Sequence, residues 1–297
     1  MLYLKSFRLP GIAEEDAYLL GSPWELTMSC YPTSIAYPFK LFVNKGLSRI
    51  DFEPITIFYG GNGSGKSTLL SVIAKKLSIP RTAPSQSSQC FDAYVDLCRA
   101  EMAPRVKEIP KESRMLTSES VFDLLLDGRS INSSIEEERQ AIFDEYKKTR
   151  EMPYADSPFL SFDDLEELKR RREAWRGTKN AYTVKRLSAK EAISASNGEC
   201  AFKYFTDRID RDALYILDEP ENSLSPGLIL ELSDYLESAV RFFGCQLIIA
   251  THSPFLLAMK GAKVYDLDTL PVVARDWREL RNVKIYFDFF SKHADNK

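Results

Sequence analysis

Residues 60–68 read Gly60-Gly61-Asn62-Gly63-Ser64-Gly65-Lys66-Ser67-Thr68, and this stretch decides the fold of the chain. It matches Gly-x-x-x-x-Gly-Lys-Ser/Thr, the pattern of a loop that binds phosphate, at every fixed position. Residues 55–59 form an apolar run that predicts a buried strand, and residues 67–76 predict a helix. A plain glycine turn is the alternative, but a strand, a glycine loop and a helix in this order are the context that the pattern requires.

The loop residues have separate expected roles. The glycines allow successive backbone N–H groups to surround a phosphate, and the helix N-terminus adds the positive end of its dipole. Lys66 can reach the outer phosphates, and the Ser67 hydroxyl can ligate Mg²⁺. We expect the residues that bind the nucleotide to be Gly60, Asn62, Gly63, Ser64, Gly65, Lys66, Ser67 and Thr68.

A pair of adjacent carboxylates follows a second apolar run. Residues 214–217 predict a strand, and Asp218-Glu219-Pro220 comes directly after it. Ligands of parallel sheets bind at the carboxyl ends of the strands, so both carboxylates are expected at the site. Asp218 can hold the Mg²⁺ shell, and Glu219 can orient or deprotonate an attacking water. Two acidic residues at a Pro220 turn are the structural alternative.

A third apolar run, residues 247–250, ends in Thr251-His252. The chain has two histidines, and the other one, His293, lies in the charged tail. His252 can contact the γ-phosphate or the attacking water, and we expect it to be catalytic. A histidine that only makes structural hydrogen bonds is the alternative.

The order of the predicted elements indicates an α/β fold. The chain has 297 residues, 44% of them hydrophobic, which is enough for a sizeable core. Strands alternate with helices from residue 213 onward, and this order predicts a mainly parallel core sheet. Residues 80–192 are mostly charged and helical in pattern, and we expect them to be an insertion. The N-terminal part is expected to be an antiparallel β region, with predicted strands at 2–9, 39–43 and 50–52.

Composition argues against several classes of protein. The net charge of −3 gives no general argument for binding nucleic acid or an anionic membrane. No apolar run approaches ~20 residues, and the N-terminus lacks the layout of a signal peptide. The five cysteines are scattered and predict reduced thiols rather than a metal site. We therefore expect a cytoplasmic protein with no membrane partner.

The three motifs together resemble the ATP-binding-cassette (ABC) class of P-loop ATPases. The soluble branch with the SMC and RecF ATPases is more similar, and the stand-alone ATPases of the AAA_21/AAA_23 type are more similar still. The segment 218–226, Asp-Glu-Pro-Glu-Asn-Ser-Leu-Ser-Pro, resembles the stand-alone family, whereas transporter cassettes usually have Asp-Glu-Pro-Thr. The resemblance implies a P-loop NTPase of the ABC-ATPase type, with residues 1–297 as a single domain. ATP and Mg²⁺ are the implied cofactors.

The resemblance also implies roles for residues outside these motifs. Residues 195–199, Ala-Ser-Asn-Gly-Glu, resemble a degenerate signature segment, in which Ser196 and Gly198 would contact the γ-phosphate of a facing subunit. Glu119 stands where the family has its Q-loop glutamine, which contacts the metal. The structural alternatives are an ordinary turn at Ser196–Gly198 and a helix N-cap region around Glu119.

A cluster of Lys and Arg occupies residues 169–190, after an acidic stretch at 163–167. It could bind DNA, RNA or an acidic partner. We favour a solvated helix that pairs with its acidic neighbour, because few aromatic residues are interleaved.

The implied function is an ATP hydrolase that closes a head-to-tail homodimer on ATP and acts as a switch for a separate effector protein, as in phage defence or DNA repair. The alternative is the nucleotide-binding subunit of a membrane transporter. A fused nuclease is disfavoured, because about 45 residues after His252 are too few for a further domain.

Overall fold

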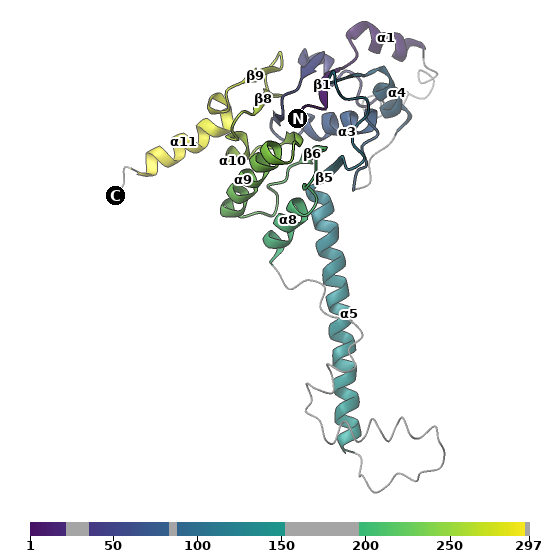
Figure 1. Cartoon of the computed structure of the whole chain (residues 1–297), viewed down its shortest axis with the longest axis vertical. Coiled ribbons are helices and arrows are strands. Elements are labelled where there is room, and N and C mark those ends of the chain that lie inside the picture. Colours follow the sequence, from purple (N-terminus) through teal and green to yellow (C-terminus); the bar gives the residue numbers. More distant parts are fainter. Residues whose placement is uncertain (22–35, 83–87, 152–195, 295–297) are drawn as a thin grey trace. The chain divides into compact units, whose positions relative to one another are not determined.

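The computed structural model describes residues 1–21, 36–82, 88–151 and 196–294. It divides into two compact units, which are Met1–Val121 with Asn197–Lys297, and Phe122–Ser196. The described residues of the first unit form two sheets and contain all three motifs (Figure 1). Residues 122–151 of the second unit belong to one long helix, α5 (Ser118–Glu151).

The core of the first unit is a six-stranded sheet with strand order β5-β6-β7-β3-β8-β9. All neighbours are parallel except the last pair, β8 and β9, which is antiparallel. This mixed α/β architecture confirms the expected fold class. The strands are β3 (Ile55–Tyr59), β5 (Arg114–Thr117), β6 (Leu214–Asp218), β7 (Gln246–Ala250), β8 (Lys263–Asp266) and β9 (Val273–Arg275).

The three central strands are buried on both faces. Every residue of β3, β6 and β7 is buried, as expected for parallel strands that are covered by helices on both sides. Helix α3 (Lys66–Lys76) packs against β6 and β7 through Leu69, Leu70 and Ile73, while α9 (Pro226–Phe242) contacts α8 (Asn197–Thr206) and α10 (Pro254–Leu257). The parallel central strands therefore bring the loops after β3, β6 and β7 to one edge of the sheet.

The second sheet is small and antiparallel. It has the order β2-β1-β4, with β1 (Leu4–Arg8) between β2 (Arg49–Asp51) and β4 (Arg99–Met102). The expected antiparallel N-terminal part is thus present. The other elements in the described ranges are α1 (Ile12–Gly21), η2 (Val43–Lys45), α4 (Gln89–Leu97), η3 (Trp277–Glu279) and α11 (Arg281–Ala294).

The strand expected over residues 39–43 is wrong. These residues form turns that lead into η2. Phe39 and Phe42 are both buried, and their spacing of three suits a helical turn better than an alternating strand. Lys40 and Gly46 have positive φ angles of 65°, which no regular strand contains.

The first part of the expected insertion, residues 80–192, contains strands as well as helices. Strand β4 belongs to the small sheet, and β5 pairs with β6 in the core sheet. Met115 and Leu116 are fully buried, so the core sheet needs this strand to cover β6. The second compact unit begins at Phe122.

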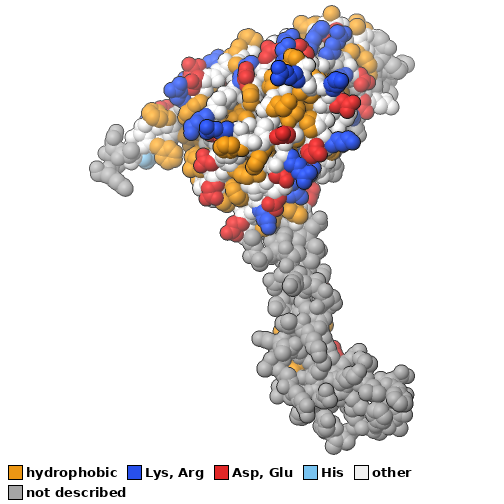
Figure 2. Space-filling view, viewed as in Figure 1, with side chains coloured by type: hydrophobic (Ala, Val, Ile, Leu, Met, Phe, Trp, Pro, Cys, Tyr) orange, Lys and Arg blue, Asp and Glu red, His pale blue; other side chains and the backbone are white. Residues whose placement is uncertain are grey.

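The molecular surface of the first unit mixes charges with apolar groups. On the face shown in Figure 2, Lys and Arg side chains are interspersed with Asp and Glu, consistent with a net charge of −3. Large apolar side chains are exposed along α11, namely Ile285, Tyr286, Phe287, Phe289 and Phe290. None of the helices in the described ranges has both the length and the apolar composition needed to cross a bilayer.

One buried amide joins the two sheets. Gln246, at the start of β7, has no exposed surface, and its Oε1 accepts hydrogen bonds from the N–H groups of Tyr3 and Leu4, both at 2.8 Å. Its Nε2 donates to the carbonyl of Leu4 at 2.9 Å and to that of Glu53 at 3.4 Å. Each buried backbone group would cost free energy if it lost this partner.

We predict that Gln246→Leu lowers the free energy of unfolding by about 3 kcal/mol or more, because it leaves two buried N–H donors without an acceptor. Urea unfolding followed by circular dichroism measures the change. Gln89→Leu, at an exposed position in the first turn of α4, is the matched control and should change stability by less than about 0.5 kcal/mol. Equal stability of the two variants would contradict the role of Gln246.

Candidate functional site

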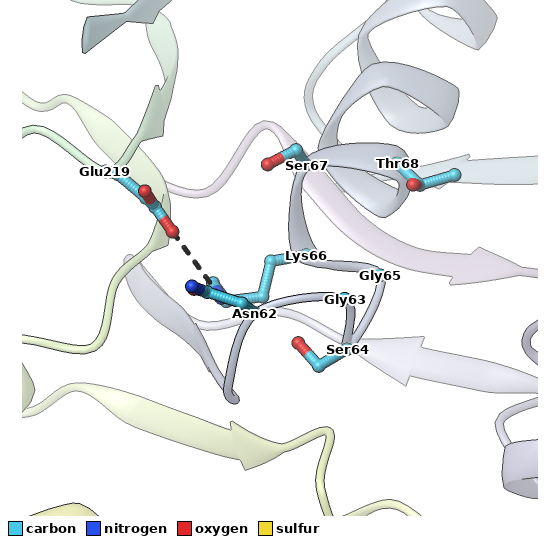
Figure 3. Close-up of a pocket in the computed structure, with 8 residues that line it drawn as sticks. All are labelled: Asn62, Gly63, Ser64, Gly65, Lys66, Ser67, Thr68 and Glu219. Carbon is cyan, nitrogen blue, oxygen red and sulfur yellow. Dashed lines mark ion pairs between the residues drawn. The ribbon is translucent and has the colours of Figure 1, made fainter.

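The phosphate loop runs from the end of β3 into the first turn of α3. Gly63 and Gly65 have φ angles of 77° and 96°, a region that L side chains rarely adopt. A side chain at Gly60 would place its Cβ 2.5 Å from Ser64 Oγ, so only glycine fits there. The loop and Glu219 line a pocket of about 340 Å³, drawn in Figure 3.

Lys66 is held in place by the loop itself. Its side chain is 5% exposed, and Nζ donates to the carbonyls of Gly60 at 2.7 Å and Gly61 at 3.1 Å. Nζ also lies 3.5 Å from Glu219 Oε1, the ion pair marked by a dashed line in Figure 3. The ammonium group is therefore fixed at the pocket, between the loop and a carboxylate.

Ser67 and Asp218 form a pair of oxygen ligands. Ser67 Oγ donates to Asp218 Oδ1 at 3.0 Å, and Asp218 is the last residue of β6. Burial raises the pKa of Asp218 to about 6, against the opposing effect of the Ser67 hydrogen bond, and the neighbouring Glu219 raises it further. A buried carboxylate next to a hydroxyl fits Mg²⁺, a hard cation that binds one or two protein oxygens together with substrate phosphates. Across the described residues, no three His, Cys, Asp or Glu side chains gather as a larger metal site.

Glu219 has an unusual backbone conformation. Its φ is 47°, which is uncommon for a residue other than glycine and often marks a functional position. Its N–H donates to the carbonyl of Ala250, so the backbone is tied to the end of β7. The carboxylate accepts a hydrogen bond from Asn222 Nδ2 at 3.2 Å and lies near Lys66 and His252. The turn thus directs Glu219 toward the phosphate loop.

His252 lies two residues after β7 with a 44% exposed side chain. Its Nδ1 is 3.8 Å from Glu219 Oε1 and 3.4 Å from Glu221 Oε1. Its carbonyl accepts a hydrogen bond from Asn282 Nδ2, and the Asn282 N–H donates to the hydroxyl of Tyr59 at the end of β3. The structure therefore brings together the phosphate loop, the carboxylate pair and His252.

The remaining predicted residues lie elsewhere. Glu119 is in the first turn of α5, 70% exposed, and its carboxylate pairs with Arg81 at 3.3 Å. Gly198 is in the first turn of α8, where an added Cβ would lie 3.1 Å from Leu228 Cδ1, and the exposed Ser196 directly precedes this helix. The roles given to these three residues stay predictions. The basic cluster at 169–190 lies outside the described residues.

Two acidic residues of the site were not predicted from the sequence. Asp268 follows β8 and accepts the N–H of Gly61 at 2.9 and 3.1 Å, so it binds the start of the phosphate loop. Glu221 is 7% exposed and bonds to the segment that carries His252. Both residues follow a strand of the parallel sheet, and this position is the feature of the sequence from which they could have been predicted.

We predict a distinctive pH dependence of stability for the nucleotide-free protein. The pKa of Asp218 is about 6 in the folded state, above the unfolded value of about 4, so the folded state binds this proton more tightly. The contribution of protonated Asp218 to the free energy of unfolding is fully present below about pH 4. It is lost as the pH rises through about 6. In Asp218→Asn, the side chain at position 218 does not ionise, so this loss of stability should be absent. The variant should be more stable than the wild type near pH 7 by up to about 3 kcal/mol.

Urea unfolding at a series of pH values measures this effect. Asp234→Asn, at an exposed position of α9, is the control and should leave the pH profile unchanged. If Asp218→Asn has the same profile as the wild type, the buried carboxylate does not cause the effect.

Comparison with known proteins gave one family model and a number of solved structures, two of which are described here. The model of the family AAA_21, described as "AAA domain, putative AbiEii toxin, Type IV TA system", matches residues 136–258. None of the curated proteins matches the chain. A solved structure described as "An inward-facing conformation of a putative metal-chelate type ABC transporter" is 18% identical, covers 82% of each chain and has a TM-score of 0.36. Stu0660 of Streptococcus thermophilus is 13% identical, covers 84% of this chain and 78% of its own, and has a TM-score of 0.39.

The matched region contains β6 with the carboxylate pair and β7 with His252, and the phosphate loop precedes it. Residues 136–258 are therefore similar to the AAA_21 family, and they share one parallel sheet with the strand that leads into the phosphate loop.

Proposed function

We propose that this protein is a Mg²⁺-dependent ATP hydrolase. The observation that carries the proposal is the constellation at the edge of the core sheet: Lys66 lies 3.5 Å from Glu219, and Ser67 bonds to Asp218 at 3.0 Å. A phosphate-binding lysine, a pair of metal-ligating oxygens and a carboxylate that can accept a proton from water are the groups that phosphoryl transfer to water requires.

The loop binds and orients the phosphates. Backbone N–H groups of residues 63–68 and the start of α3 stabilise their negative charge, and Lys66 adds a positive charge. Ser67 and Asp218 would hold Mg²⁺, which neutralises charge on the outer phosphates when bound. Phosphate oxygens would compete with Glu219 for Lys66 and so release the Glu219 carboxylate to accept a proton from the attacking water.

His252 is placed to act next to Glu219. With Nδ1 3.8 Å from Glu219 Oε1, the imidazole can contact the γ-phosphate or the same water. In this proposal, Glu219 is the general base, Lys66 stabilises the transition state, and His252 senses the γ-phosphate.

The family resemblance supports a second part of the proposal, a head-to-tail homodimer in which ATP is bound at composite sites. Ser196 and Gly198 of a second copy would complete each site, and Glu119 would contact the metal. Hydrolysis would reopen the dimer, and this switch would act on a separate effector. The matched family, whose description names a toxin and a Type IV TA system, supports a partner of this kind.

We predict that Lys66→Ala weakens ATP binding by about 100-fold, because a buried, charge-assisted contact to the phosphates is lost. Isothermal titration with Mg·ATP measures the affinity. Lys75→Ala changes an exposed lysine at the other end of the same helix and should leave binding intact. Retained affinity in Lys66→Ala would contradict the assignment of the phosphate loop.

Glu219→Gln should keep ATP affinity but lower the hydrolysis rate by about 100-fold or more, because the general base is lost while the shape of the side chain is kept. The trapped ATP state should accumulate as a dimer, which sedimentation velocity in Mg·ATP detects. Glu231→Gln, exposed on α9, is the control for both measurements. Undiminished hydrolysis would exclude Glu219 as the base, and a monomer in saturating ATP would exclude the dimer.

A further inference from the structure

Glu221 is a buried carboxylate that the proposed chemistry does not use. It lies in the turn after β6, two residues beyond Glu219, with a side chain that is 6% exposed. Burying a carboxylate is costly unless it is paired and hydrogen-bonded. One of its oxygens, Oε2, is buried without a hydrogen-bond partner among the described residues.

The other oxygen, Oε1, binds the segment that carries His252. It accepts the hydroxyl of Thr251 at 2.6 Å and the N–H of His252 at 3.0 Å. The Thr251 hydroxyl, in turn, accepts the N–H of Ser253 at 3.0 Å. A single oxygen thus fixes the backbone on both sides of His252.

The same oxygen is also close to the imidazole ring. It lies 3.4 Å from His252 Nδ1, nearer than Glu219 Oε1 at 3.8 Å. In a neutral imidazole one ring nitrogen carries the proton, and its neighbours decide which one. Two carboxylate oxygens beside Nδ1 favour the Nδ1–H tautomer and leave Nε2 as the unprotonated nitrogen.

We propose that Glu221 is a positioning residue that acts through His252. It holds the imidazole beside Glu219 and selects its Nδ1–H tautomer, so the catalytic turn after β6 controls the imidazole after β7. The proposal rests on the proposed ATPase function for its effect on rate, while the tautomer is independent of turnover.

The variant Glu221→Gln distinguishes an effect on the His252 imidazole from a purely structural role in hydrogen bonding to the backbone. The amide oxygen of Gln can still accept from Thr251 and the His252 N–H, but the negative charge beside Nδ1 is gone. We expect kcat to fall about 10-fold, with KM and ATP affinity within about twofold, because a group that acts only in the reaction step is affected. We expect a larger loss of kcat in His252→Ala. The kcat of the double variant should equal that of His252→Ala, because Glu221 acts through His252.

Additive losses in the double variant, or an unchanged kcat in Glu221→Gln, would overturn the proposal. Failure of the proposed function looks different, because in that case the wild type and Lys66→Ala would both lack ATP hydrolysis. Glu231→Gln again controls for the loss of one charge at an exposed position.

A measurement on the imidazole requires no activity. The chain has two histidines, so His293→Ala leaves His252 as the single source of side-chain signals. In alkaline buffer, where imidazoles are neutral, ¹⁵N shifts should show the Nδ1–H tautomer, and Glu221→Gln should move them toward a mixture. A predominant Nε2–H tautomer in the His293→Ala protein, which retains Glu221, would overturn the proposal. This outcome can be observed even if Glu221→Gln fails to fold.

Discussion

The parallel register of β6, β7 and β3 is the constraint on which the site depends. Asp218 and Phe58 both pair with Ala250, so the three strands end at nearly the same level. Each strand is followed by a loop with different chemistry. The phosphate loop follows β3, the turn with Glu219 follows β6, and the segment with His252 follows β7. A shift of one strand by one residue would turn its side chains to the other face and remove its functional group from the site.

The site is rich in carboxylates around one lysine. Asp218 ends β6, Glu219 and Glu221 lie in the turn that follows, and Asp268, which follows β8, accepts a hydrogen bond from the phosphate loop. Nearby cations and hydrogen-bond donors satisfy these groups only in part, as the raised pKa of Asp218 and the unpaired oxygen of Glu221 show. A polyanionic substrate would add negative charge, and this supports the proposal that a divalent cation binds together with it.

Features encoded locally could be predicted from the sequence. The phosphate loop, Asp218, Glu219 and His252 each follow an apolar run, and the rule for parallel sheets placed them together. The bonds of Glu221 and Asp268 could not be predicted in this way, because their partners lie 30 and 207 residues away. The prediction of a strand at 39–43 is wrong because a short apolar run without clear periodicity is equally compatible with a turn.

The amide of Gln246 has a consequence for how the protein is made. It satisfies the backbone of Tyr3 and Leu4 from 243 and 242 residues further along the chain. A ribosome that synthesises the chain from its N-terminus exposes β1 long before this partner emerges. Until Gln246 has been synthesised, the N–H groups of Tyr3 and Leu4 therefore lack this acceptor.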